Sequence, residues 1–190
     1  MRLLGAVLVQ ARRPVRLPVG PAIRAPLDVR HLLRIPTHAV IVHAVVVFVP
    51  LTAIAAVALT AVPRWRTRFG VLAGLAAVTS IGSVFVAQES GEILEDWVLS
   101  APDAPFELVL AHTALGEDLL PWVLVLSVAL LALIGLAFWA NRRGSDRPSW
   151  TNPAAWGIGA ISVVGAVLSL VYVIRIGHSG SEAVWSDLPG

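Results

Sequence analysis

Four long apolar runs, separated by polar segments, dominate the pattern of this chain. They cover about residues 37–62, 70–87, 119–140 and 154–176. Each has the roughly 18 to 26 residues needed to cross about 30 Å of hydrocarbon at 1.5 Å per residue. None has a charged residue in its middle, as the cost of charge inside a membrane requires. The pattern predicts an all-α integral membrane protein, built as a four-helix bundle.

Composition agrees with lipid as the solvent of this chain. Hydrophobic residues make up 57% and charged residues only 14%, and the mean hydropathy of +0.80 lies outside the usual range of soluble domains. The chain has no cysteine, which excludes disulfides and thiolate ligands. No basic face with interleaved aromatic residues is present, so the expected partner is the lipid bilayer and not nucleic acid.

The chain divides into an arm and a membrane domain. Residues 1–35 combine many arginines with several prolines and show no sustained periodicity, so we predict an irregular N-terminal arm there. Residues 36–190 form the four-transmembrane-helix domain. The sequence shows no internal repeat of useful period.

Arginines in two short loops predict how the chain is oriented across the membrane. The loops near 64–68 and 142–147 each carry three arginines, whereas segment 88–118 has eight acidic residues and no basic one. Basic loops are typical of the cytoplasmic side. Both termini and the acidic segment are therefore predicted to lie outside.

Helix ends and packing faces can also be predicted. A start near Pro105 makes the third helix longer than the bilayer, with a kink near Pro121, and Gly177 is predicted to stop the fourth helix. Small residues at spacings of three and four predict close helix packing. They are Ala53, Ala56 and Thr60, then Gly70 and Gly74, then Gly159, Ser162, Ala166 and Ser169.

The predicted topology brings several chemically capable side chains to one membrane face, because they lie at the same end of antiparallel helices. His43 is the strongest candidate, since it lies deepest in an apolar span where an unpartnered imidazole is costly. His112 follows the apolar pattern of its own helix and is expected to face inward or to lie at a helix seam. Solvated boundary positions and helix caps are the alternatives for His38 and His178, and Glu92 is the carboxylate nearest the membrane.

The order of several motifs along the chain resembles that of a known family. His38 and His43 begin the first helix, Ser90-Gly91-Glu92 follows the second, His112 precedes the third, and Gly177-His178-Ser179-Gly180 ends the fourth. In this order the motifs resemble the bacterial domain of unknown function 2231 family, over about residues 35–185. The resemblance implies a small four-helix domain in the bacterial inner membrane, whose relatives are sometimes joined to Rieske-type or cytochrome c domains. Ala39, Ala44 and Thr113 depart from the residues usual in that family.

The leading hypothesis is therefore a redox-linked membrane domain that binds b-type haem or a transition metal ion near its outer face. His43, His112 and His178 are the expected ligands, with His38 and Glu92 as alternates, and a redox protein or another membrane subunit as the expected partner. Two alternatives stay open: a cofactor-free accessory subunit, and a zinc-dependent membrane hydrolase using three histidines and Glu92. No standard catalytic or metal motif decides between them.

Overall fold

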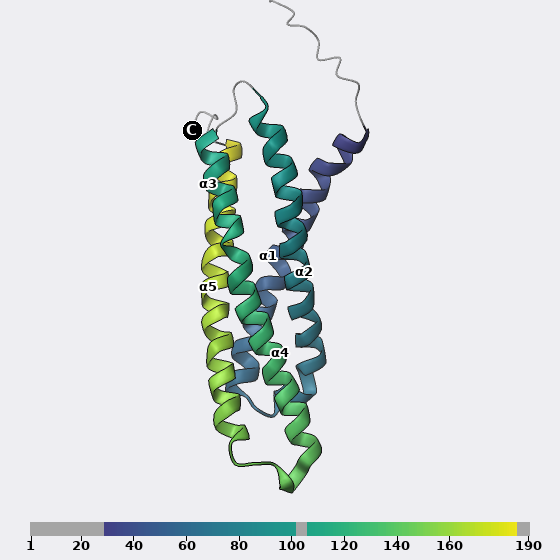
Figure 1. Ribbon diagram of the computed structural model, residues 1–190, viewed down its shortest axis with the longest axis vertical. Coiled ribbons are helices and arrows are strands. Elements are labelled where there is room, and N and C mark those ends of the chain that lie inside the picture. Colours follow the sequence, from purple (N-terminus) through teal and green to yellow (C-terminus); the bar gives the residue numbers. More distant parts are fainter. Residues whose placement is uncertain (1–28, 102–105, 186–190) are drawn as a thin grey trace, which may run out of the picture.

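The protein is a bundle of long helices in the computed structural model (Figure 1). The model describes the backbone of residues 29–101 and 106–185, and the side chains of 38–101 and 106–182. Four helical stretches within these residues are long and apolar enough to cross a membrane, which confirms the predicted all-α membrane fold. The helices are α1 (Val29–Ala61), α2 (Trp65–Leu99), α3 (Phe106–Glu117), α4 (Leu119–Arg143) and α5 (Thr151–Trp185), with a short 3-10 turn at Gly144–Asp146.

The helices pack around the bundle in a fixed cyclic order. Helix α1 packs against α2 on one side and α5 on the other, while α4 packs against α2 and α5. Helix α1 makes few contacts with α4, so these two lie on a diagonal, and α3 continues the line of α4 beside α5 (Figure 1). A residue on α1 and one on α3 can therefore face each other across the bundle axis.

Helix α1 begins earlier than predicted. It starts at Val29 and continues through Pro36, so the last part of the segment 1–35, expected to be irregular, is helical. Residues 29–35 contain neither glycine nor proline, and arginine and leucine are good helix formers. The first turns of α1 diverge from the other helices in Figure 1. Residues 1–28 lie outside the described part of the chain.

The third membrane segment is interrupted where the sequence predicted a kink. Helix α3 ends at Glu117 and α4 begins at Leu119, with Asp118 between them. Pro121 lacks the N–H that would bond to the carbonyl of Glu117, and its ring crowds that carbonyl. The proline therefore accounts for a break one turn before it. Gln88 of α2 donates from Nε2 to the Gly116 carbonyl at 2.9 Å, across the gap to α3.

The end of the fourth segment differs from the prediction. Gly177 does not stop the helix, because α5 runs on to Trp185. His178 lies 3.3 Å from Glu182 one turn later, and this (i, i+4) pair favours continued helix. The extension gives α5 a contact surface for α3.

Small residues form the helix seams, as predicted. Ala56, Ser162 and Ser169 have no exposed surface, and Ala53 and Ala166 almost none. The closest approach occurs at Gly165, where a Cβ would lie 2.6 Å from the Leu126 backbone nitrogen. At Gly159 a Cβ would lie 2.7 Å from a Thr60 side-chain atom. Glycine permits both contacts because it has no side chain.

Arginine and tryptophan gather at the end of the bundle that holds the α1–α2 and α4–α5 connections. Arg66 is buried and donates from Nε to the Leu59 carbonyl (2.7 Å) and from Nη2 to the Thr60 carbonyl (3.0 Å). It satisfies carbonyls of the last turn of α1 and complements the negative end of that helix. Trp139 and Trp150 stack at 5.7 Å. This end has the composition of a membrane interface.

Candidate functional site

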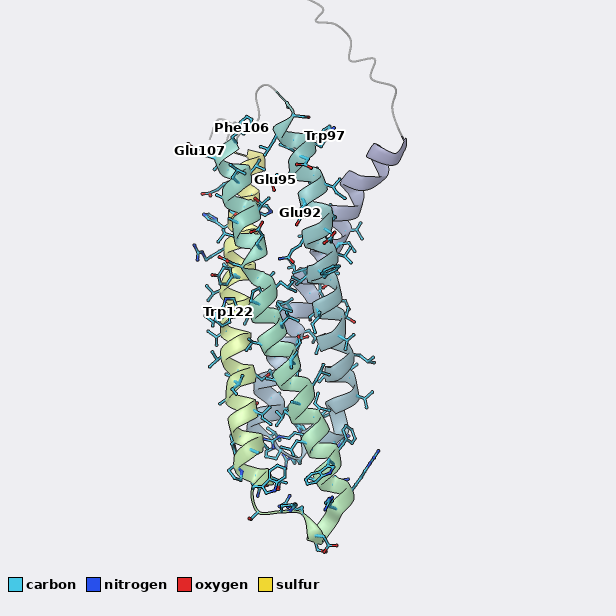
Figure 2. All side chains as sticks on the ribbon, in the orientation of Figure 1. Glu92, Glu95, Trp97, Phe106, Glu107 and Trp122 are labelled. Carbon is cyan, nitrogen blue, oxygen red and sulfur yellow. The ribbon has the colours of Figure 1, made fainter. Side chains whose placement is uncertain are left out.

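The candidate site lies at the opposite end from the arginines. Ser90 is 24 positions beyond Arg66 in the same helix, a rise of about 36 Å at 1.5 Å per residue. This distance slightly exceeds the roughly 30 Å of hydrocarbon in a bilayer. The layer of helix containing Ser90 is therefore at the far membrane boundary. Figure 2 labels Glu92, Glu95 and Trp97 just beyond it on α2, and Glu107 on α3 at the same end.

His38 is fixed by a serine and a glycine of the neighbouring helix. Its Nδ1 lies 2.9 Å from Ser90 Oγ on α2, and Ser90 Oγ donates to the Ala87 carbonyl at 3.1 Å. Gly91 lies against the ring, because a Cβ built there would be 3.3 Å from His38 Cε1. The imidazole of α1 thus rests on a Ser-Gly pair of α2.

His112 is held in the same way by a different pair of helices. Its Nδ1 lies 3.0 Å from Ser179 Oγ on α5, and Ser179 Oγ donates to the Ile176 carbonyl at 3.1 Å. A Cβ at Gly180 would be 3.0 Å from His112 Cε1. His112 is thus partly buried at the seam between α3 and α5.

Hydrogen-bond valence links the serine proton to the ring tautomer. A serine hydroxyl has one proton, and a carbonyl oxygen can only accept. When Ser90 and Ser179 give that proton to the carbonyls of Ala87 and Ile176, Nδ1 of His38 and of His112 donates to the serine oxygen. The proton of each neutral ring is then on Nδ1, and Nε2 has a free lone pair. This is the state in which imidazole binds a metal.

The two imidazoles belong to α1 and to α3, which continues the line of the diagonal helix α4. Below them, Val45, Val84 and Leu119 belong to the last closely packed layer. Beyond that layer every described side chain keeps some exposed surface. Partly buried aliphatic side chains at this end are Ile41, Val42, Leu94, Leu108, Leu115 and Ile176.

His43 does not take the inward position expected for it. Its side chain is exposed, and Nδ1 lies 2.6 Å from the Ala39 carbonyl one turn earlier in α1. The five residues from His38 turn a helix by about 140°, so only one of the two rings can face the bundle axis. A bond to the helix backbone satisfies His43 without any partner from another helix.

His178 and Glu92 also lie outside the expected convergence. His178 is 76% exposed and pairs with Glu182, although its neighbours Ser179 and Gly180 contact His112. Glu92 is exposed, next to the Gly91 that contacts His38. His43 and His178 therefore do not take inward positions, whereas His38 and His112 are each partly buried against a serine of a neighbouring helix.

The described side chains contain no group of three or more histidine, cysteine, aspartate or glutamate residues that could hold a metal ion. A zinc site normally takes three or four protein ligands. The arrangement with three histidines and Glu92 is thus not formed in this part of the chain. Two imidazoles suit a cofactor that brings most of its own ligands.

Sequence reasoning missed the residues that hold the two histidines. Ser90 and Ser179 were noticed only as neighbours of Glu92 and His178, yet they make the contacts. The available signal was the recurrence of Ser-Gly near the ends of the second and fourth helices. Two copies of one dipeptide, each one helix away from a histidine, indicate a repeated structural role.

Fold and site define the class of this molecule: a helical multi-pass membrane protein with a pair of histidines near one membrane boundary. The chain belongs to the DUF2231 family of predicted membrane proteins, whose model matches residues 34–188. No curated protein and no solved structure matches it.

Proposed function

We propose that this protein is a redox-linked domain of the bacterial inner membrane that binds one b-type haem between His38 and His112. One observation carries the proposal: each ring contacts a serine of a neighbouring helix through Nδ1, so Nε2 is the ring nitrogen left for a ligand. Four-helix bundles build cofactor sites from side chains on facing helices, and imidazole is a common axial ligand of haem.

The number of donors favours haem over a bare metal ion. A porphyrin supplies four nitrogens, so two imidazoles complete the six positions around iron. The described residues offer these two and no third neighbouring donor. Partly buried aliphatic side chains at this end of the bundle also suit a mainly apolar ligand.

Bound haem would supply one-electron chemistry at the outer boundary of the membrane, where a redox protein or another membrane subunit has access. The protein contributes position and environment: α1 and α3 orient the ligands, and the bundle excludes water from the side below. The orientation follows from the arginines at the opposite end, which favour the cytoplasm.

Absorbance of the full-length protein purified from haem-replete cells tests the proposal. We expect a Soret band with the spectrum of six-coordinate low-spin haem, at one haem per chain. His38→Ala and His112→Ala should each abolish haem retention. His43→Ala and His178→Ala are the matched controls and should keep it, because those two side chains are exposed.

Two results would count against haem. A colourless protein that stays colourless after haem is added would favour the cofactor-free accessory subunit. Haem that survives the double change of His38 and His112 would place the ligands elsewhere. Metal analysis on the same samples separates a bound metal ion from either outcome.

A further inference from the structure

The two histidine sites are copies of one another because the bundle repeats a helical hairpin. Every buried residue of the described part of α1 has a buried counterpart in α4 exactly one fixed offset later: Val45 matches Leu119 and Leu59 matches Leu133, 74 positions on. The same offset carries His38 to His112. The remaining pairs are Val49 and Val123, Thr52 and Leu126, Ala53 and Ser127, Ala56 and Leu130, Thr60 and Ile134.

Most buried positions of α2 repeat in α5 in the same manner, while buried Ser83 and Val84 match the partly buried Tyr172 and Val173. An offset of 89 positions carries Ser90-Gly91 to Ser179-Gly180 and buried Ser80 to buried Ser169. It also carries the close-contact Gly70 to Gly159. The further matches of buried residues are Arg66 with Ala155, Ala73 with Ser162, Ala76 with Gly165, and Ala77 with Ala166.

Helical periodicity alone would align two buried faces in some register. Here the two offsets that align the buried faces, 74 and 89, also align His38 with His112 and Ser90-Gly91 with Ser179-Gly180. The packing agrees: α1 with α2 corresponds to α4 with α5, and α1 with α5 corresponds to α4 with α2. These correspondences are those that an approximate two-fold axis along the bundle would produce, as in membrane proteins built from parallel repeats.

From this repeat we infer that Ser90 and Ser179 are equivalent positioning residues, which keep the proton of His38 and His112 on Nδ1 and present both Nε2 atoms to the bundle axis. The inference about the ring protons rests on the hydrogen bonds. The use of His38 and His112 as axial ligands rests on the proposed function. Such partners orient a ligating histidine and raise its basicity.

Nitrogen-15 NMR of histidine-labelled full-length protein in detergent tests the inference without any cofactor. At a pH where the rings are neutral, the shifts distinguish protonated from unprotonated ring nitrogens, and His38→Ala and His112→Ala assign the signals. Both residues should carry the proton on Nδ1. Ser90→Ala should move the proton of His38 alone toward Nε2, and Ser179→Ala that of His112 alone.

Ser100 and Ser181 provide matched controls. Each donates to the carbonyl three residues earlier, at 2.6 and 2.7 Å, as Ser90 and Ser179 do, but neither contacts a histidine ring in the described structure. Ser100→Ala and Ser181→Ala should leave both tautomers unchanged. If wild-type His38 or His112 carries its proton on Nε2, or if Ser90→Ala and Ser179→Ala leave the tautomers as they were, the inference is overturned.

Haem-loaded protein gives a second readout, which separates the two proposals. Ser90→Ala and Ser179→Ala should keep the haem but raise its midpoint potential by similar amounts, because weaker donors stabilise ferric iron less. An unchanged potential in both variants would refute a role of the serines in tuning. Failure of haem to bind, with the tautomers as expected, would refute the proposed function and leave the positioning role in place.

Discussion

Two glycines of α5 provide a sharp test of the packing that sets the position of Ser179. Gly165→Ala puts a methyl group at the contact with α4, where the added Cβ would lie 2.6 Å from the Leu126 nitrogen and 2.8 Å from its Cα. Both atoms are backbone, so no rotamer change relieves the contact. Ordinary contact begins at 3.4 Å, and α5 must move outward by roughly 0.8 Å at this point.

Overpacking of this kind costs typically about 1 to 3 kcal/mol. Gly157→Ala is the matched control, because it makes the same chemical change in the same helix at a position with nothing within 4 Å. Any gain in helix propensity applies to both variants. We therefore expect Gly165→Ala to be about 1 to 3 kcal/mol less stable than Gly157→Ala.

Unfolding by increasing mole fraction of dodecyl sulfate in mixed micelles, followed by far-ultraviolet circular dichroism, measures this difference. Equal stability of the two alanine variants would show that α4 and α5 do not meet at Gly165 and would refute the packing described above. If the seam is correct, Gly165→Ala should also loosen the end of α5 that holds His112.

Three further predictions concern the bundle. Arg66→Ala should cost about 2 to 3 kcal/mol of unfolding free energy, because it leaves the Leu59 and Thr60 carbonyls without their charged donor; exposed Arg64→Ala should cost almost nothing in the same assay. Thr52→Val, which removes the buried 2.9 Å bond to Ser80, should cost about 0.6 to 1.7 kcal/mol, and a larger loss would mean that the hydroxyl has another partner. A reporter fused after residue 190 should be active only outside the cytoplasm; activity inside would invert the topology.

Much of the fold could be read from the sequence because the membrane imposes strong constraints. A helix must satisfy its backbone internally and needs about 20 apolar residues to cross, so the four spans follow from counting. Pro121 indicated the break between α3 and α4 for an equally local reason, because proline lacks the N–H that a continuous helix needs. The prediction that Gly177 ends the fourth helix was wrong, because glycine permits a helix end without requiring one. Contacts with α3 favour the continuation of α5 beyond this residue.

The orientation of side chains about each helix was a different problem. In water, an apolar stripe reveals which face of a helix is buried. In a membrane the lipid is as apolar as the core, so the valines around His43 give no direction. The sequence could state that His38 and His43 differ by about 140°, but not which of them faces inward.

Only the tertiary structure decided that question, because it depends on which neighbours the helix meets. Packing of α1 on α2 turns His38 toward Ser90 and leaves His43 to bond its own helix backbone. The repeat was hidden for the same reason: residues such as Thr52 and Leu126 differ chemically and share only a buried position. The sequence by itself determined which segments cross the membrane and which histidines share one end, while helix packing determined which two of them are held against a neighbouring helix.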